Sequence, residues 1–225
     1  MPRAPRLHVP GGLYHAVLRG NHQHVIFDGG ADYRTFEDIL ARALHRYGAR
    51  LHAYCWMTNH VHLAVQVGDV RLGRLMQAVA SSYARRKQQQ VPTTGHLFER
   101  RYRAILVDND AYWLTVIRYI HRNPVEAGIV ADPADYRWSS HRGYLGRGRP
   151  PWLTTAPTLA MFGCGAVDSV AAYRRFVAGD TAVEAAPSSA TVVTPHSLIG
   201  FELDKRGNVQ SLEQVVLEVS SELSV

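Results

Sequence analysis

Two apolar, strand-like segments, residues 50–57 and 61–67, are joined by Thr58 and Asn59. Amphipathic helical patterns flank this pair, because apolar residues recur at three- and four-residue spacing on both sides of it. One more strand is expected before the first helix and another after the second. The order strand, helix, strand, strand, helix, strand, helix is the split βαβ plan with one helix added. The sequence therefore predicts an α+β, ferredoxin-like fold, in which an antiparallel sheet carries helices on one face. The expected elements are a strand at 13–18, a helix at 32–47, strands at 50–57 and 61–67, a helix at 70–88, a strand at 102–107 and a helix at 110–122.

The boundaries of the folded part follow from turn-forming residues. The third helix is expected to end before Pro124, because proline disfavours helical dihedral angles in the residue that precedes it. Residues 1–146 are interpreted as the catalytic domain. Residues 147–165 begin with a segment rich in Pro, Gly and Thr and are interpreted as a linker. Residues 166–225 are expected to form a C-terminal helical extension, with candidate helices at 166–177 and 211–223.

The charge of the chain is divided unevenly between its two parts. Residues 1–150 carry 21 Lys and Arg against 11 Asp and Glu, a balance of +10, whereas residues 151–225 have a balance of -4. A basic module followed by an acidic segment is typical of a nucleic-acid enzyme with a separate extension. A genome that favours arginine codons would explain why Arg outnumbers Lys by 23 to 2, but it does not explain the asymmetry.

Composition also argues against a membrane or secreted protein. The apolar fraction is 46% and the mean hydropathy is -0.17, as expected for a soluble protein. No apolar run is long enough for a transmembrane helix, and no hydrophobic segment follows the basic N-terminus. Cys55 and Cys164 lie far apart in the sequence, which indicates a reducing compartment and no cysteine-built zinc site. We therefore expect a cytoplasmic protein.

The most informative polar residues are His60 and His62, which interrupt an apolar strand-like run. Residues two apart in a strand share one face of the sheet, so both imidazoles should point the same way. Buried ionisable side chains need a partner, and two imidazoles on one face can hold a metal ion. A second His-x-His, His22-Gln23-His24, follows a turn and lacks the alternating apolar flanks of a strand, so we interpret it as a surface loop.

A second pair, Tyr119 and Asn123, lies four residues apart on the third expected helix and so shares one helix face. A tyrosine on an amphipathic helix often belongs to the core, and an asparagine ahead of proline often ends a helix. Here Trp113, Ile117 and Ile120 supply the buried stripe and Tyr119 lies on the neighbouring one, which makes it a candidate nucleophile. Tyr112, on the same stripe as Tyr119, is the alternative nucleophile.

These motifs, with their order and flanks, resemble the single-tyrosine HUH nucleases, and in particular the REP-associated tyrosine transposases. The resemblance spans residues 10–146, and no one segment alone would be specific. The matching segments are Gly12-Leu13-Tyr14-His15, Arg19-Gly20-Asn21, Ala53-Tyr54-Cys55-Trp56-Met57-Thr58-Asn59-His60-Val61-His62, Gly95-His96-Leu97-Phe98, Arg100-Arg101-Tyr102, Arg118-Tyr119-Ile120-His121-Arg122-Asn123-Pro124-Val125-Glu126-Ala127-Gly128 and Trp138-Ser139-Ser140.

The resemblance implies a DNA transposase that cleaves and rejoins single-stranded hairpin DNA beside short palindromic (REP) repeats. Tyr119 is then the nucleophile that forms a 5′-phosphotyrosine link, with His60 and His62 as catalytic metal ligands and Asn123 as the third ligand. The cofactor is Mg²⁺ or Mn²⁺, and two imidazoles favour Mn²⁺, because Mg²⁺ prefers oxygen ligands. The oligomeric state, monomer or homodimer, stays open.

Basic residues beside aromatic ones suit contacts with a nucleic-acid backbone and its bases. Residues 85–87 have a second explanation that fits equally well, because basic side chains near the C-terminal end of a helix interact favourably with the helix dipole. The residues expected to bind nucleic acid are Arg19, Arg85, Arg86, Arg100, Arg101, Tyr102 and Arg103.

A relaxase or replication initiator would share such a site, but these are usually larger and carry the tyrosine elsewhere. Two alternatives from other functional classes stand beside the enzyme. The first is a catalytically decayed DNA-binding protein on the same scaffold; the intact His60, His62 and Tyr119 favour the enzyme over it. The second, an RNA-binding sheet, is disfavoured because the strands lack an exposed aromatic cluster of the RNA-recognition type. Residues 211–216 resemble the start of a C-terminal helix-turn-helix, which would be truncated in this chain.

Overall fold

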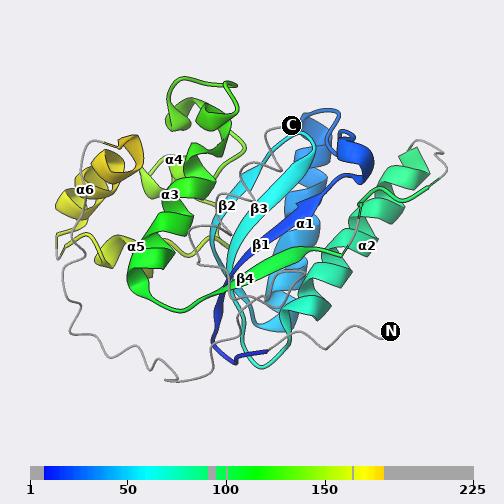
Figure 1. The fold of residues 1–225 in the computed structure, drawn as a ribbon, viewed down its shortest axis with the longest axis horizontal. Coiled ribbons are helices and arrows are strands. Elements are labelled where there is room, and N and C mark those ends of the chain that lie inside the picture. The colour runs from blue at the N-terminus through cyan, green and yellow to red at the C-terminus, as the bar shows by residue number, and fades with distance from the viewer. Residues whose placement is uncertain (1–7, 91–94, 100, 164, 180–225) are drawn as a thin grey trace, which may run out of the picture. The chain divides into compact units, whose positions relative to one another are not determined.

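A four-stranded antiparallel sheet with the strand order β2-β3-β1-β4 forms the centre of the computed structural model (Figure 1). The structure describes residues 8–90, 95–99, 101–163 and 165–179. The elements within these residues are β1 (Leu13–Arg19), η1 (Asn21–Gln23), α1 (Gly30–Tyr47), β2 (Arg50–Trp56), β3 (His60–Gln66), α2 (Leu72–Gln90), β4 (Arg103–Val107), α3 (Asp110–Glu126), η2 (Pro133–Asp135), α4 (His141–Tyr144), α5 (Ala156–Ala160) and α6 (Ala166–Ala178).

The predicted ferredoxin-like plan is confirmed by the order and pairing of these elements. β2 and β3 form a hairpin, β1 lies between β3 and β4, and α1 and α2 provide the two connections of the split βαβ unit. The α+β class follows from the same arrangement, because the sheet is antiparallel throughout and the helices lie outside it.

The expectation of helices on one face holds for α1 and α2, whereas α3 covers the other face of the sheet. Alternate residues of a strand point to opposite faces. In β3, Val61, Leu63 and Val65 pack with α1 and α2 in one hydrophobic cluster, but Ala64 packs with α3 in a second cluster. The sheet is therefore buried on both sides, with α3 as the added helix of the plan.

The predicted end of α3 before Pro124 is wrong, because the helix continues through the proline to Glu126. Proline lacks an N–H, so one helical hydrogen bond is lost at this position. The loss is limited because the helix ends within the next turn, where the Pro124 carbonyl accepts the N–H of Ile129 at 2.9 Å. The Pro124 side chain is buried, and this packing compensates for the missing bond.

The segment that follows α4 packs onto the sheet although its composition is that of a linker. The Thr154 N–H donates to the Leu51 carbonyl at 2.8 Å, and Leu153 is buried in the cluster under α1 and α2. On the other face, Tyr173 of α6 is buried in the cluster with α3. All described residues fall within one compact unit. The candidate helix at 211–223 lies outside the described residues.

Among the described residues, no helix has the length and apolar character needed to cross a lipid bilayer.

We predict that a chain ending at Gly146 does not fold stably. Such a chain loses Leu153 and Tyr173, whose side chains are 4% and 0% exposed. Removing one large buried side chain costs about 2–5 kcal/mol, and a typical domain is stable by only about 5–15 kcal/mol. Thermal melting followed by circular dichroism measures the effect, with a chain ending at Gly179, which keeps both residues, as the control. A cooperative melt of the shorter chain near that of the control would contradict the prediction.

Candidate active site

The face of the sheet under α3 carries small side chains, and this lets the helix approach closely. Ala53 and Cys55 of β2 and Ala64 of β3 belong to the cluster with α3, and all three are fully buried. A small residue between a helix and a sheet shortens the distance at which they pack. His60 and His62 lie on this same face, so α3 covers the edge of a site that contains both histidines.

Each of the two histidines is oriented by a hydrogen bond through its Nδ1 atom. His60 Nδ1 lies 2.7 Å from Asn59 Oδ1, and His62 Nδ1 lies 3.1 Å from His15 Nε2. Because Asn59 donates its amide N–H to the Gln23 carbonyl, its Oδ1 is the acceptor and His60 Nδ1 carries the proton. The Nε2 atom of His60 then has a free lone pair.

The Nε2 atoms of His60 and His62 are both buried, and neither has a hydrogen-bond partner among the described residues. The two rings lie 4.9 Å apart between centroids and are nearly perpendicular. A buried polar atom without a partner destabilises a fold by about 1–3 kcal/mol unless something satisfies it. Two such atoms side by side are what a bound cation would satisfy.

Burial keeps both imidazoles neutral at neutral pH. Desolvation lowers the pKa of His60 to about 4, and the nearby positive charge of Arg19 acts in the same direction. Desolvation also lowers the pKa of His62 well below its usual value. The Asn123 side chain acts in the opposite direction on both pKa values, so it lies within polar reach of both rings, although neither Nε2 atom has a hydrogen bond of standard geometry. Neutral imidazole is the form that binds metal ions.

α3 places Tyr119 and Asn123 over the two histidines. The Tyr119 ring lies 5.4 Å from the His62 ring and 5.7 Å from the His15 ring, in both cases nearly perpendicular to it. Asn123, one turn later, is 8% exposed. Tyr112 makes no ring contact with a histidine in the described part of the chain, and burial raises the pKa of its phenol. The structure therefore brings Tyr119 to the imidazoles and leaves Tyr112 apart from them.

The side chains in this site fit a divalent cation that takes mixed nitrogen and oxygen ligands. Within the described ranges, no group of three or more His, Cys, Asp or Glu side chains could hold a metal ion. The donors near the site are two neutral imidazoles and the Asn123 amide, which leaves positions for water or substrate oxygens. An open set of this kind is typical of a catalytic metal rather than a structural one.

His15 is a further residue of the site, which the spacing of motifs in the sequence did not indicate. It lies on β1, is 5% exposed, and stacks on His62 with ring centroids 5.4 Å apart. Desolvation lowers its pKa to about 4. Its position in an apolar strand could have indicated a role, because a histidine there is buried and a buried imidazole requires a hydrogen-bonding partner. Its contact with His62 Nδ1 fixes the orientation of that ring.

A buried polar network fixes α3 against β2. His121 Nε2 lies 2.6 Å from the Ser140 hydroxyl, which in turn accepts the Tyr54 N–H at 2.8 Å. The Tyr173 hydroxyl lies 2.9 Å from His121 Nδ1 and 2.6 Å from His141 Nδ1. His121 follows Tyr119 by two residues, so this network sets the rotation of the helix that carries Tyr119.

The residues expected to bind nucleic acid do not form one surface. Arg19 lies opposite His60 in the β1–β3 register, and Arg103 begins β4 on the other side of β1. Arg85 and Arg86 are on α2, which covers the opposite face of the sheet. Tyr102 is 8% exposed and packs in the core, so it cannot stack on a base, contrary to expectation. Arg101 is exposed, and Arg100 lies outside the described residues.

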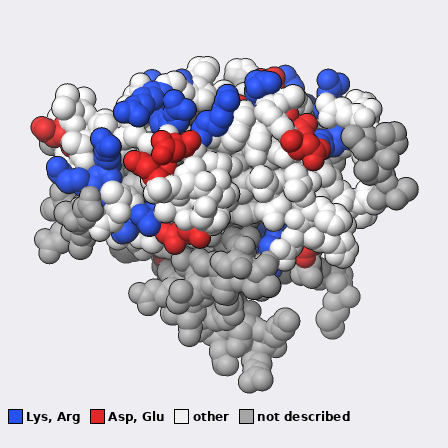
Figure 2. All heavy atoms as spheres, turned by 90° about the horizontal axis from the view of Figure 1, so that it is seen from above, with Lys and Arg blue, Asp and Glu red and all other residues white. Residues whose placement is uncertain are grey.

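The distribution of charged side chains on the surface is likewise divided into separate groups. Figure 2 shows one face of the molecule, on which Lys and Arg side chains form several separate groups with Asp and Glu side chains between them. The second His-x-His also stays apart from the site: His22 and His24 are exposed near η1, with ring centroids 6.2 Å apart. We conclude that the site is local to β3, β1 and α3.

The family model for IS200-like transposases matches residues 8–123, a range that contains both histidines, Tyr119 and Asn123. The chain belongs to the IS200-like transposase family. Members of a transposase family bind and cleave DNA and transfer its strands, so the chain is a DNA-binding transposase by family.

One solved structure supports the fold assignment, and two others are less similar. A REP-associated tyrosine transposase bound to a REP hairpin is 16% identical, with a TM-score of 0.56 over 69% of this chain and 92% of that chain. A transposase from Deinococcus radiodurans is 23% identical, with a TM-score of 0.38 over 54% of this chain and 97% of that one. tRNA(His) guanylyltransferase from Saccharomyces cerevisiae is 9% identical, with a TM-score of 0.37 over 74% and 78% of the two chains. No curated protein matches the sequence.

We predict that this transposase loses stability as the pH falls below the usual pKa of histidine. Burial lowers the pKa of His52 and of His141 from 6.5 to about 4 in the folded protein. Below 6.5 the unfolded chain binds protons that the folded protein does not, so the free energy of unfolding falls as the pH drops toward 4. Each residue contributes up to roughly 3 kcal/mol over this window.

Urea denaturation at neutral pH and at about pH 5 measures this loss, because the proton linkage of each histidine is then partly developed. His52→Gln keeps a polar side chain without an ionisable group and should flatten the dependence. An unchanged urea midpoint across this pH range in the natural protein would show that the buried histidines do not resist protonation.

Proposed function

We propose that this transposase cleaves and rejoins single-stranded DNA through a covalent tyrosine intermediate at the site formed by His60, His62 and Tyr119. The observation that supports this most directly is the Tyr119 ring against His62, beside two buried Nε2 atoms without hydrogen-bond partners in the described part of the chain. Metal-assisted phosphodiester transfer requires a nucleophile next to side chains that can bind a cation, and Tyr119 beside the two imidazoles meets this requirement.

In the proposed reaction, Tyr119 Oη attacks the phosphorus of the scissile phosphodiester. A new phosphorus–oxygen bond forms to the tyrosine, and the bond to the 3′ oxygen breaks. The phenol gives up its proton to solvent, and the departing 3′ oxygen takes one up as a free 3′-OH. The 5′-phosphotyrosine link conserves the phosphodiester, so attack by a 3′-OH rejoins the strand without ATP.

His60, His62 and Asn123 would hold the divalent ion, Mg²⁺ or Mn²⁺, on this face of the sheet. When bound, such an ion supplies Lewis-acid polarisation of the scissile phosphate. His15 and Asn59 orient the two imidazoles, and both rings are held neutral by burial, so no proton has to leave them before a ligand binds. The two nitrogen donors favour Mn²⁺ over Mg²⁺.

The DNA strand would reach this site at the end of the sheet where Arg19 faces His60. Arg101 and Arg103 precede and begin the neighbouring strand β4, so they lie on the path of a backbone that approaches Tyr119. Arginine binds phosphates through charge and paired N–H donors. We place this activity in the bacterial cytoplasm, on hairpin-forming repeats of the nucleoid.

We predict that Tyr119→Phe abolishes the covalent protein–DNA adduct and leaves hairpin binding unchanged. The substitution removes only the hydroxyl that would attack, and it should change stability by less than about 1 kcal/mol. A labelled hairpin with a single-stranded flank is incubated with the protein and Mn²⁺, and the adduct is read on a denaturing gel. Tyr112→Phe is the matched control. Loss of the adduct in the control and its survival in Tyr119→Phe would reverse the assignment.

We also predict that His60→Ala and His62→Ala each eliminate Mn²⁺ binding, whereas His22→Ala and His24→Ala do not. The first pair shares a buried sheet face, and the second pair is exposed in a loop. Calorimetric titration with Mn²⁺ measures binding without DNA. His62 is fully buried, so a melting curve must show that its variant is folded. A folded variant of either site residue that binds Mn²⁺ normally would refute the metal site.

A further inference from the structure

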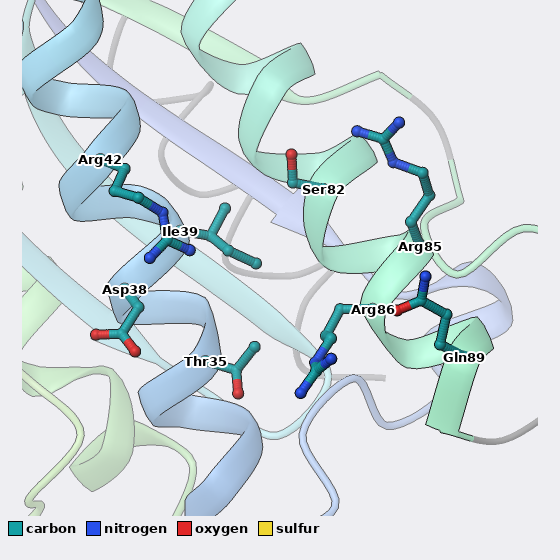
Figure 3. A pocket seen from close by; sticks show the side chains of 8 residues that line it. All are labelled: Thr35, Asp38, Ile39, Arg42, Ser82, Arg85, Arg86 and Gln89. Atoms are coloured by element: carbon teal, nitrogen blue, oxygen red, sulfur yellow. The ribbon is translucent and has the colours of Figure 1, made fainter.

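The helix that carries Tyr119 has a second helix beside it, α6, and the contacts between these two helices have no part in the proposed reaction. On the other face of the sheet, α1 and α2 leave a groove of about 590 Å³ that side chains of both helices line (Figure 3). α3 and α6 are instead joined by hydrogen bonds and a ring contact. α6 begins at Ala166, beyond the residues 8–123 that the family model matches, so membership of the family assigns no function to it.

The residues of α3 that contact α6 form a stripe separate from the one that faces the two imidazoles. His121 and Arg122 lie three and four residues after Arg118, so the three share one face of the helix. Tyr119 and Asn123 lie on the adjoining face. Because both faces belong to one helix, a contact that turns or shifts the first face also turns or shifts the second.

Two arginines of α3 hold the C-terminal end of α6. Arg122 Nη1 donates to the Val177 and Ala178 carbonyls, at 3.2 Å each. The last carbonyls of a helix have no partner within the helix and carry partial negative charge, so an arginine stabilises them. The Arg118 guanidinium lies over the Phe176 ring, 5.5 Å from its centroid. These contacts fix the end of α6 against α3.

The Tyr173 hydroxyl is the interior link between the two helices. It lies 2.9 Å from His121 Nδ1 in α3 and 2.6 Å from His141 Nδ1 in α4. A hydroxyl has one proton, so it donates to one imidazole and accepts from the other, and each neutral ring is then confined to one tautomer. All three side chains are buried, so bulk water does not compete for these bonds. Without the hydroxyl, each ring would lose this partner for a buried nitrogen, and α3 would lose a directional restraint.

We propose that α6 restrains the helix of the nucleophile, and that Tyr173 is a positioning residue for strand cleavage. Its hydroxyl acts through His121 to hold α3 in the rotation that presents Tyr119 to the scissile phosphate. The role in cleavage rests on the proposed function, whereas the restraint of Tyr119 rests on the contacts between the two helices. Tyr173 itself touches neither the substrate nor the imidazoles of His60 and His62.

The test substitution is Tyr173→Phe, and Tyr144→Phe is its matched control. Tyr144 is buried as well and stacks on Tyr173, with ring centroids 4.7 Å apart. The Tyr144 hydroxyl donates to the His52 carbonyl of β2 at 2.9 Å. The two substitutions thus remove the same buried group from neighbouring rings, but only Tyr173→Phe removes the hydrogen bond to His121.

The first measurement is the rate constant of adduct formation in a single turnover, with Mn²⁺ and a saturating labelled hairpin that has an unpaired flank. We expect Tyr173→Phe to lower this rate constant about tenfold to a hundredfold, because a small misplacement of a reacting group has an effect of this size. The Kd of the hairpin and the Kd of Mn²⁺ should stay unchanged, and Tyr144→Phe should react like the natural protein. An unchanged rate constant in Tyr173→Phe, an equal fall in the control, or a change in Kd instead of rate would each overturn the proposal.

The second measurement uses neither metal nor DNA, so it distinguishes failure of this proposal from failure of the proposed function. Tyrosine labelled with ¹³C at Cζ gives one NMR signal per residue, and the Tyr119 signal is the one that Tyr119→Phe lacks. We expect Tyr173→Phe to shift or broaden this signal and Tyr144→Phe to leave it unchanged. An unchanged Tyr119 signal in Tyr173→Phe would exclude the restraint. A natural protein that forms no adduct, with the shift present, would instead refute the proposed function and leave the restraint standing.

A pair of surface variants decides the question if Tyr173→Phe does not fold. Arg122→Gln loses the contacts with the last two carbonyls of α6 and the ion pair with Glu126, in which Arg122 Nε lies 2.9 Å from Oε1. Glu126→Gln loses only the ion pair and is the control. Arg122→Gln should lower the rate constant of adduct formation and shift the Tyr119 signal, and Glu126→Gln should do neither. Equal behaviour of the two variants would overturn the proposal.

Discussion

The close packing of α3 against the sheet is the constraint on which the candidate site depends. Ala53, Cys55 and Ala64 lie under the helix and are fully buried, so no bulky side chain keeps helix and sheet apart. The same approach removes water from His60 and His62 and lowers their pKa values. A larger residue at any of the three small positions would lift the helix and separate its two site residues from the imidazoles.

Packing alone does not fix the rotation of a helix about its axis, and here the buried polar network supplies that information. The Ser140 hydroxyl bonds to the backbone of Tyr54 in β2 and to the His121 ring in α3, so it ties the helix to one strand. Directional hydrogen bonds in a low-dielectric interior restrict geometry more than apolar contacts do. Because Tyr119 is two residues from His121 on the same helix, the network also restricts the position of Tyr119. A nucleophile must be held within a narrow range of positions to react.

The sequence contained enough information for the fold plan and for the pairs His60/His62 and Tyr119/Asn123, because each depends on a local period. A two-residue period assigns a strand face, and a four-residue spacing assigns a helix face. Contacts between elements that are distant in the sequence do not follow from a local period, so the sequence pattern did not predict them. The partner of His62, His15, comes from a strand that is distant in sequence, and the burial of Tyr102 depends on the packing around it. The continuation of α3 through Pro124 likewise depends on tertiary packing that outweighs a local preference.

The histidine pair is a less stable choice for a strand interior than the apolar residues around it. Val61 and Leu63 on the neighbouring positions of β3 are fully buried and need no partner. His60 and His62 instead leave two buried nitrogen atoms without a partner among the described residues, although Asn59 and His15 satisfy their other nitrogens. A hydrogen bond to one nitrogen of each ring, with the other nitrogen buried and unpartnered, does not stabilise the protein in the absence of a ligand. It is instead suited to a ligand that occupies the space between the sheet and α3, which is the position that Tyr119 faces.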